Sequence, residues 1–346
     1  MKRIAIICVI LCTPLLINAQ VQIPTLDDLD HEIAMSSQYD KQYEDVIRSV
    51  KKQLHAAKTL EARCELSDKL FNLYSSYSVD SAIVYAMEKQ KIAKAMGNQS
   101  KVNDAKLNLA YLLIRGGELK EASDIINSIP RSEINQDLSF YYFSTRKTLY
   151  HTLADAALIP LQRKQYKQME KLCNDSVVDN NQSPDIWSRA EQLVNRQQYE
   201  QAKKILLDAY HHLKPGDRQT AFVSISLADI YGREKNVEAQ KQYLIAAAIS
   251  DIRNSVKEYL ALQQLAMILF EEGDTKRAYA YMDHAMNDAV FCNARQRTIA
   301  MADVWPAIAK SHERETKSRT LKLTAALVLI SLMSVFLLVM IIYTRR

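Results

Sequence analysis

Residues 116–122 read GGELKEA, residues 272–278 read EGDTKRA, and the same turn recurs without a glycine at 195–202 as NRQQYEQA. In each segment a short polar turn leads into a helix that carries an alanine in its first turn. Alanine there lets two helices approach closely, because its side chain is small. Residues in this register recur every 37 to 40 positions when Gln162 is counted in the third copy. The alanines of the series are Ala82, Ala122, Ala202, Ala239 and Ala278.

The helices before these turns carry a second mark, a small residue directly after a leucine. It occurs at Leu109-Ala110, Leu227-Ala228 and Leu265-Ala266. Two helices per copy and a period near 40 residues resemble the tetratricopeptide repeat, lengthened from its usual 34 residues. In such an array each helix pair buries its apolar stripe only against its neighbours. The pattern therefore predicts an all-α fold, a tetratricopeptide-like α-solenoid of about six helix pairs.

Helices outside the repeats complete the map. A leading helix near 26–56 lies in an N-terminal helical cap over 20–59, the repeats occupy 60–290, and a last helix near 292–318 follows. Pro306 should kink or break that last helix, because proline lacks a backbone N–H and clashes with the preceding turn. The helix pairs are expected near 60–97, 101–129, 137–177, 184–213, 218–250 and 255–290.

The 21 residues from Leu323 to Tyr343 contain no charge, and thirteen of them are Leu, Ile, Val or Phe. As a helix that rises about 1.5 Å per residue, this run is roughly 32 Å long, enough to cross the hydrocarbon core of a bilayer. We therefore predict a single C-terminal transmembrane helix at 323–343. Residues 291–322 then form a juxtamembrane helix, and residues 344–346 form a cytoplasmic tail.

The N-terminal sequence predicts on which side of the membrane the repeat domain lies. A positive start at Met1-Lys2-Arg3, an apolar stretch and the small Ala19 are typical of a signal peptide over 1–19. An uncleaved anchor is the alternative, and it leaves residues 20–320 on the same outer side. The expected location is a bacterial inner membrane, with a periplasmic repeat domain and a cytoplasmic C-terminus.

The basic residues beside the apolar run oppose this orientation. The positive-inside bias alone would keep the large domain in the cytoplasm. We give the N-terminal segment more weight, since long domains translocate largely regardless of charge. The basic residues before the run are Lys310, Arg314, Lys317, Arg319 and Lys322, against Arg345 and Arg346 after it.

Composition excludes several classes of protein. The formal charge of +5 on 346 residues falls to about +3 without Lys2 and Arg3, which does not suit a nucleic-acid-binding polycation. Six glycines and seven prolines argue against turn-rich β folds. After removal of the signal peptide, the cysteines are Cys64, Cys173 and Cys292. They are too dispersed for a disulfide framework or a metal site, so buried free thiols are expected. Phosphate-loop, HExxH and nucleophile-elbow motifs are absent from the sequence, so no cofactor, metal or enzymatic activity is predicted.

Local clusters of polar and aromatic residues have simpler explanations than chemistry. His211 and His212 point about 100° apart on a helix, and so cannot share a metal. His284 and Asp288, spaced i and i+4, could flank an ion, but a surface pair is the simpler interpretation. The aromatic run at 140–143 covers the whole circumference of a helix, so contact between repeats is expected rather than a ligand box.

Positions on the first helix of each pair are the candidates for partner binding, because these helices line the concave face of such solenoids. Both charge signs and large aromatic side chains occur there, which suits a peptide or protein segment better than a polyanion. A merely solvated face is the alternative. Counting from the alanines gives Tyr111, Arg115, Lys147, His151, Asp155, Trp187, Glu191, Asp229, Arg233 and Gln263.

A wider family resemblance rests on four segments, LDDLDHEI at 26–33 with the following YDK at 39–41, SVDSAIVYA at 78–86, residues 109–122, and FYYFSTRKTLYHTLAD at 140–155. Together they resemble bacterial membrane-anchored regulators, in which an exported tetratricopeptide-repeat sensor precedes one span, a cytoplasmic coiled coil and a helix-turn-helix module. The resemblance covers about 20–346. Because the sequence stops after the span, it implies the sensor half of a split or truncated regulator, or one that signals through a separate partner.

The favoured function is a non-enzymatic periplasmic module that binds a peptide or protein and relays binding through the last helix into the span. The chain itself is not expected to bind nucleic acid, and pairing of two copies stays open. An envelope assembly scaffold without a signalling role is the alternative. A cytoplasmic adaptor with a tail anchor ranks third, and an enzyme fourth.

Overall fold

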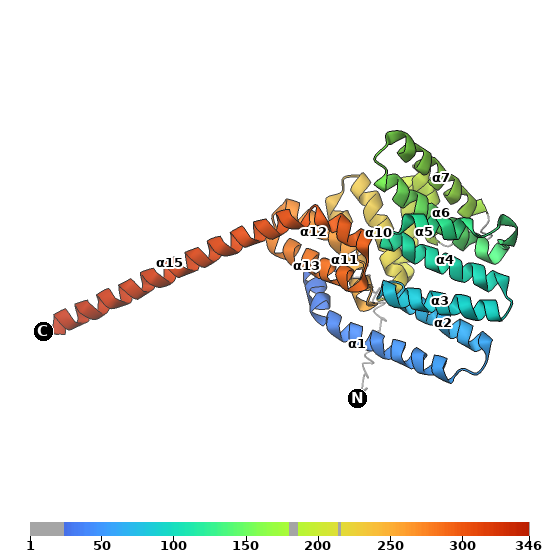
Figure 1. The fold of residues 1–346 in the computed structure, drawn as a ribbon. Coiled ribbons are helices and arrows are strands. Elements are labelled where there is room, and N and C mark those ends of the chain that lie inside the picture. Colours follow the sequence, from blue (N-terminus) through green and yellow to red (C-terminus); the bar gives the residue numbers. More distant parts are fainter. Residues whose placement is uncertain (1–23, 180–185, 214–215, 346) are drawn as a thin grey trace, which may run out of the picture.

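The computed structural model describes residues 24–179, 186–213 and 216–345, and within these ranges the chain forms α-helices, one 3-10 turn, η1 (Arg131–Glu133), and no strand (Figure 1). The signal peptide expected at 1–19 lies outside the described residues. Six helix pairs follow a long first helix, α1 (Leu26–Ala56), which confirms the all-α solenoid. The pairs are α2 (Leu60–Tyr74) with α3 (Val79–Ala95), α4 (Gln99–Gly116) with α5 (Leu119–Asn127), α6 (Gln136–Ala156) with α7 (Pro160–Asp179), α8 (Ile186–Asn195) with α9 (Tyr199–His212), α10 (Arg218–Arg233) with α11 (Val237–Arg253), and α12 (Ala261–Glu272) with α13 (Thr275–Cys292).

The alanine register is confirmed in four of the pairs. Each of these alanines is the fourth residue of its second helix and is fully buried, as close helix contact requires. Three of the turns before them end the first helix with a left-handed residue, at Gly117 (φ 84°), Gly273 (φ 88°) and, without glycine, Gln197 (φ 60°). The four alanines are Ala82, Ala122, Ala202 and Ala278.

The register assigned to Ala239 is wrong by one residue. Helix α11 begins at Val237, so Ala239 is its third residue and Gln240 its fourth. The Gln240 side chain lies only 2.6 Å from where a Cβ on Gly232 would stand. The small residue of this pair therefore belongs to the first helix, α10, and its missing side chain makes room for the glutamine.

Helix α1 contacts both ends of the repeat array. Its C-terminal half lies on α2 and buries Ile47 and Val50, whereas its N-terminal half lies on α11 and α13 and buries Leu29. Polar contacts fix the N-terminal half. Arg277 Nε on α13 donates to Asp30 Oδ2 at 2.9 Å, and Arg253 Nη2 on α11 donates to Glu32 Oε1 at 2.5 Å.

The first and last pairs also touch directly, so the array is a closed ring instead of an open superhelix. The backbone N–H of Lys257 donates to the carbonyl of Ser76 at 2.8 Å, and Asn293 Nδ2 donates to Asp80 Oδ1 at 2.9 Å. One apolar core contains residues of both ends, among them Phe71 of α2 and Met282 of α13. We call this contact region between α1–α4 and α10–α14 the seam.

The C-terminal helices differ from the expected division. One helix was predicted over 292–318, but the chain forms α14 (Arg295–Ala302) and then α15 (Trp305–Arg345), with no break between the juxtamembrane and apolar parts. Pro306 is the second residue of α15, where proline is tolerated because the first turn needs no N–H partner. The predicted break thus falls just before the proline.

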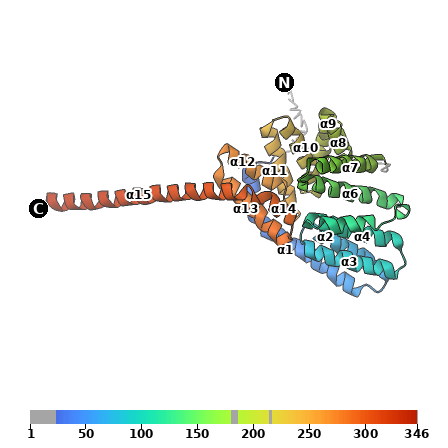
Figure 2. The same ribbon diagram turned by 45° about the horizontal axis from the view of Figure 1, so that its top comes forward.

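Helix α15 leaves the domain as an isolated rod. Its start is held by Ile308, which is fully buried, and by Tyr279 of α13, which stacks on Trp305 and His312 with ring centroids 5.2 and 4.3 Å apart. Beyond these contacts both views show the helix projecting away from the repeats (Figures 1 and 2). Its most apolar 18 residues have a mean hydropathy of 3.0 and are not buried at all, so by length and composition it can cross a membrane.

Candidate functional site

The ten candidate residues fall into three places in the structure. One group lies at the seam, one lies on α6 and α8, and one lies on α10. The groups are Tyr111, Arg115 and Gln263 at the seam, Lys147, His151, Asp155, Trp187 and Glu191 on α6 and α8, and Asp229 and Arg233 on α10.

Arg115 of the seam group holds the two ends of the array together. The Arg115 guanidinium pairs with Glu258, donates to the carbonyl of Ser75, and lies over the Tyr111 ring at 5.3 Å. The Gln263 side chain is buried, with 7% of its surface exposed. These positions differ from the expected open face, because ring closure brings the segment before α12 against α4.

The second group joins α6 to its neighbours. Lys147 Nζ donates to both carboxylate oxygens of Glu191 on α8, at 2.7 and 2.6 Å. His151 Nδ1 lies 3.0 Å from Glu170 Oε1 of α7, and its Nε2 lies 3.4 Å from Asp155 Oδ2. His151 and Asp155 are exposed. The side chain of Trp187 lies outside the described residues, so only its place on α8 is known.

The third group is a single exposed ion pair. Arg233 Nε donates to Asp229 Oδ2 at 3.0 Å, and more than half of each side chain is accessible. The hydrogen bond to Asp229 raises the pKa of Arg233, so the guanidinium stays charged. Such exposed pairs contribute only about 0–1 kcal/mol to stability. They can therefore open and form new pairs with the charges of a partner at little loss.

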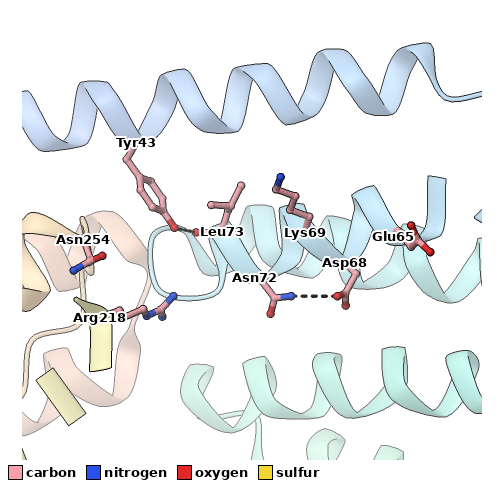
Figure 3. A pocket seen from close by; sticks show the side chains of 8 residues that line it. All are labelled: Tyr43, Glu65, Asp68, Lys69, Asn72, Leu73, Arg218 and Asn254. Carbon is pink, nitrogen blue, oxygen red and sulfur yellow. Dashed lines mark hydrogen bonds between the residues drawn. The ribbon is translucent and has the colours of Figure 1, made fainter. Parts of the chain in front are cut away.

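A cavity that the sequence did not predict lies where the seam meets α1. Its volume is about 350 Å³, and it has both carboxylates and cationic groups in its wall (Figure 3). Tyr43 reaches from α1 to the carbonyl of Leu73 at 2.6 Å, while Arg218 and Asn254 come from the far end of the array. No local pattern could have joined these elements. The lining residues are Tyr43, Glu65, Asp68, Lys69, Asn72, Leu73, Arg218 and Asn254.

A buried ion cluster lies beside α1 in the seam. Lys257 Nζ, in a side chain only 4% exposed, donates to Asp40 Oδ2 of α1 at 2.6 Å and to Asp288 Oδ2 of α13 at 3.2 Å. His284 Nε2 lies 3.4 Å from the same oxygen of Asp288. The interpretation of His284 and Asp288 as a surface pair is wrong, because both are largely buried there. Burial lowers the pKa of the His284 imidazole, which favours its neutral form.

Metal and thiol chemistry find little support in the described part of the chain. No group of three or more His, Cys, Asp or Glu side chains there is placed to hold a metal ion. Cys64, Cys173 and Cys292 are buried free thiols, as predicted. Burial raises the pKa of Cys292 to about 12, so its reactive thiolate is scarce at neutral pH. The aromatic run at 140–143 packs in the core around α6, which confirms that interpretation.

The chain matches a known protein family over most of its helical domain. A family profile described as the SusR N-terminal TPR domain matches residues 33–303, which is more than half of the chain and reaches from α1 to the end of α14. No curated protein matches the chain.

Proposed function

The chain belongs to the SusR N-terminal TPR domain family, and from this premise we propose that it is the sensor module of a membrane-anchored regulator. The module binds a peptide or protein partner in the periplasm and passes the binding event to α15. All-helical repeat domains of this type are typically non-catalytic interaction modules. The proposal accordingly includes no enzymatic step, no cofactor and no direct contact of this chain with nucleic acid.

The observation that carries the proposal is the set of contacts made by α13. Arg277 and Tyr281 of this helix hold α1, Asp288 holds the buried Lys257, and Tyr279 holds the start of α15. A change in the seam or in α1 therefore acts on the same helix that positions α15. Relay still requires that the partner bind two arrangements of the ring with different affinity.

The proposed partner surface is the exposed part of α6, α8 and α10. It offers His151, Asp155, Asp229 and Arg233 as accessible charges. Trp187, placed on α8, is the aromatic candidate from the sequence. Mixed charge with an aromatic anchor suits a polypeptide. Tyr111 and Arg115 are assigned to ring closure, and Gln263 is buried on α12, so all three leave this surface.

Orientation is tested with a cysteine introduced at an exposed position on each side. We expect Lys58→Cys, in the loop after α1, to react with a membrane-impermeant maleimide when the outer membrane is opened. Arg345→Cys, at the end of α15, should react only after lysis. Labelling in the opposite order would sink the periplasmic placement. The native cysteines outside the expected signal peptide, Cys64, Cys173 and Cys292, are buried and give a low background.

Partner binding is tested in cells with a photo-crosslinking amino acid at residue 155 or residue 229. A discrete polypeptide adduct from these positions, absent from residue 46 on the exposed side of α1, supports the partner surface. The adduct should disappear in a Trp187→Ala, Arg233→Ala double variant with unchanged thermal unfolding. Equal adducts from residue 46, or adducts that survive the double variant, would contradict the proposed surface.

An envelope scaffold without signalling remains the second candidate, and the closed ring supports it because closure stiffens the array. The two differ in one measurement. Partner binding to a sensor changes the distance between spin labels at residues 58 and 314, across the ring and α15, whereas binding to a scaffold leaves that distance unchanged.

A further inference from the structure

The segment of α15 between the repeat domain and the apolar run has a defined length. His312 makes the last described ring contact with the domain, and residues 313–322 are all exposed. Ten helical residues rise about 15 Å. The headgroup layer of one leaflet is about 5–8 Å thick, so the half of this segment next to Leu323 lies at headgroup depth.

Charge is sorted along this segment. Glu313 and Glu315 lie near the repeat domain, and no acidic residue follows them in the sequence. Lys322 and Arg319 stand about 1.5 and 6 Å above Leu323 along the helix axis. The half next to the apolar run therefore carries only positive charge.

Arg319 and Lys322 have their charges available. Among the described residues no carboxylate lies within ion-pair distance of either group, whereas Lys317 pairs with Glu313 at 2.5 Å. Their spacing of three residues places Arg319 and Lys322 on one face of the helix. A guanidinium binds phosphate oxygens in a bidentate manner, and an ammonium adds a point charge beside it.

We propose that Arg319 and Lys322 form a binding site for the headgroups of anionic phospholipids, in the leaflet that faces the repeat domain. This inference rests on the proposed membrane span of α15. The site would hold the depth of the helix at the surface, and with it the position of α13 that the proposed relay uses. It also accounts for a basic flank on the side where the positive-inside bias does not favour one.

The test uses the full chain reconstituted in phosphatidylcholine vesicles that contain spin-labelled lipid probes. We expect spin-labelled phosphatidylglycerol to associate with the protein severalfold more strongly than spin-labelled phosphatidylcholine. One basic group near an anionic membrane surface corresponds to about a fivefold preference. Arg319→Gln with Lys322→Gln should bring the ratio of the two association constants down by at least threefold, and added salt should lower the wild-type ratio.

The matched control is Lys310→Gln with Arg314→Gln. It removes the same charge from the same helix, but its nearer residue stands about 13 Å above Leu323, outside the headgroup layer of about 5–8 Å. This control variant should keep the wild-type preference for phosphatidylglycerol over phosphatidylcholine. An unchanged ratio in the Arg319 and Lys322 variant, or an equal loss in both variants, would overturn the proposed site. Flotation of the chain with vesicles after alkaline washing reports separately on the membrane span. A protein that floats but shows no lipid preference would therefore contradict only the proposed headgroup site.

Discussion

At the scale of single residues, the seam depends on charges that are withdrawn from water. Lys257 lies between two carboxylates, one on α1 and one on α13. A buried pair of this kind adds little net stability, but removal of one member leaves the other charged and unpaired. The main role of Lys257 is therefore to specify that α1 and α13 meet at this position. Its contribution to the net stability of the contact is small.

Lys257→Met should lower the free energy of unfolding by about 3–5 kcal/mol, because Asp40 and Asp288 lose their common cation. Urea unfolding of the detergent-solubilised chain measures this loss. The matched control is Lys120→Met, which removes an exposed i, i+4 pair with Asp124 and should leave stability almost unchanged. Similar losses in both variants would show that Lys257 has no special role.

Asp251 should make stability depend on pH. Burial, with the nearby charge of Glu258, raises its pKa to about 7, against about 3.9 in an unfolded chain. The stabilisation from the protonated acid is therefore complete below about pH 4 and is lost as pH rises through 7.

Asp251→Asn should raise the free energy of unfolding at pH 8 by about 2 kcal/mol, with the gain shrinking toward zero near pH 4. Thermal unfolding midpoints at pH 4.5, 6 and 8 measure the trend. Asp45→Asn, at an exposed site on α1, is the control. A gain that is the same at all three values would contradict the assignment.

At the scale of elements, α15 is attached through one aromatic contact group and one buried isoleucine. Tyr279 stacks with both Trp305 and His312, and each aromatic pair contributes about 0.5–1.5 kcal/mol beyond its buried area. The angle at which α15 leaves the domain thus depends mainly on a single tyrosine of α13.

Tyr279→Ala should loosen α15 without unfolding the ring. We expect the distance distribution between spin labels at residues 58 and 314, measured by double electron–electron resonance, to broaden clearly. Tyr166→Ala removes a comparable stack with Tyr150 on α6 and should leave the distribution narrow. Unchanged width in the Tyr279 variant would mean that Ile308 alone is enough to hold the helix.

Local sequence patterns were sufficient to predict the first helix and the six helix pairs. The first helix was expected at 26–56 and is found there, since Thr25 and Asp28 form a capping box that the sequence displays. The turns at Gly117 and Gly273 marked two more boundaries, because glycine adopts the left-handed conformation easily. The one-residue shift at Ala239 was not predicted, because the small residue at a helix contact can lie on either helix. In this pair it is Gly232 of α10, and not Ala239 of α11.

The closure of the ring was not predictable from the sequence. The seam and the cavity, which depend on that closure, were therefore not predictable either. Its contacts join residues more than 200 positions apart, such as Arg277 with Asp30 and Arg253 with Glu32. Repeat periodicity describes only neighbouring pairs, and it carries no information on whether the curvature of six pairs brings the ends together. Arg115 was therefore assigned to an open face although it pairs with Glu258 across the seam. Gln263 was assigned to the same face although it is buried.

At the scale of the whole molecule, the apolar core formed by the described residues divides into three clusters. One joins both ends of the array, one extends from α4 to α7, and one extends from α8 to α11. The first cluster ties together elements that an open solenoid would allow to unfold independently. Cooperativity should therefore be strongest between the parts of the chain that are most distant in sequence.

Hydrogen exchange measured by mass spectrometry should show this coupling. We expect amides of α2 and α12 to share one opening free energy and to be the slowest, with α7 exchanging earlier because much of its surface is exposed. In the Lys257→Met variant the protection of α2 and α12 should fall together. Loss of protection in α12 alone would contradict a coupled ring.

Closure also restricts how such a chain can change in length. An open array gains or loses a helix pair at small cost, because each pair meets only its neighbours. Here an added or deleted pair between α3 and α10 would move Ser76 away from Lys257 and Asp80 away from Asn293. The number of helix pairs is thus set by ring closure. Evolution can vary the loops and surfaces of this protein far more freely than its number of helix pairs.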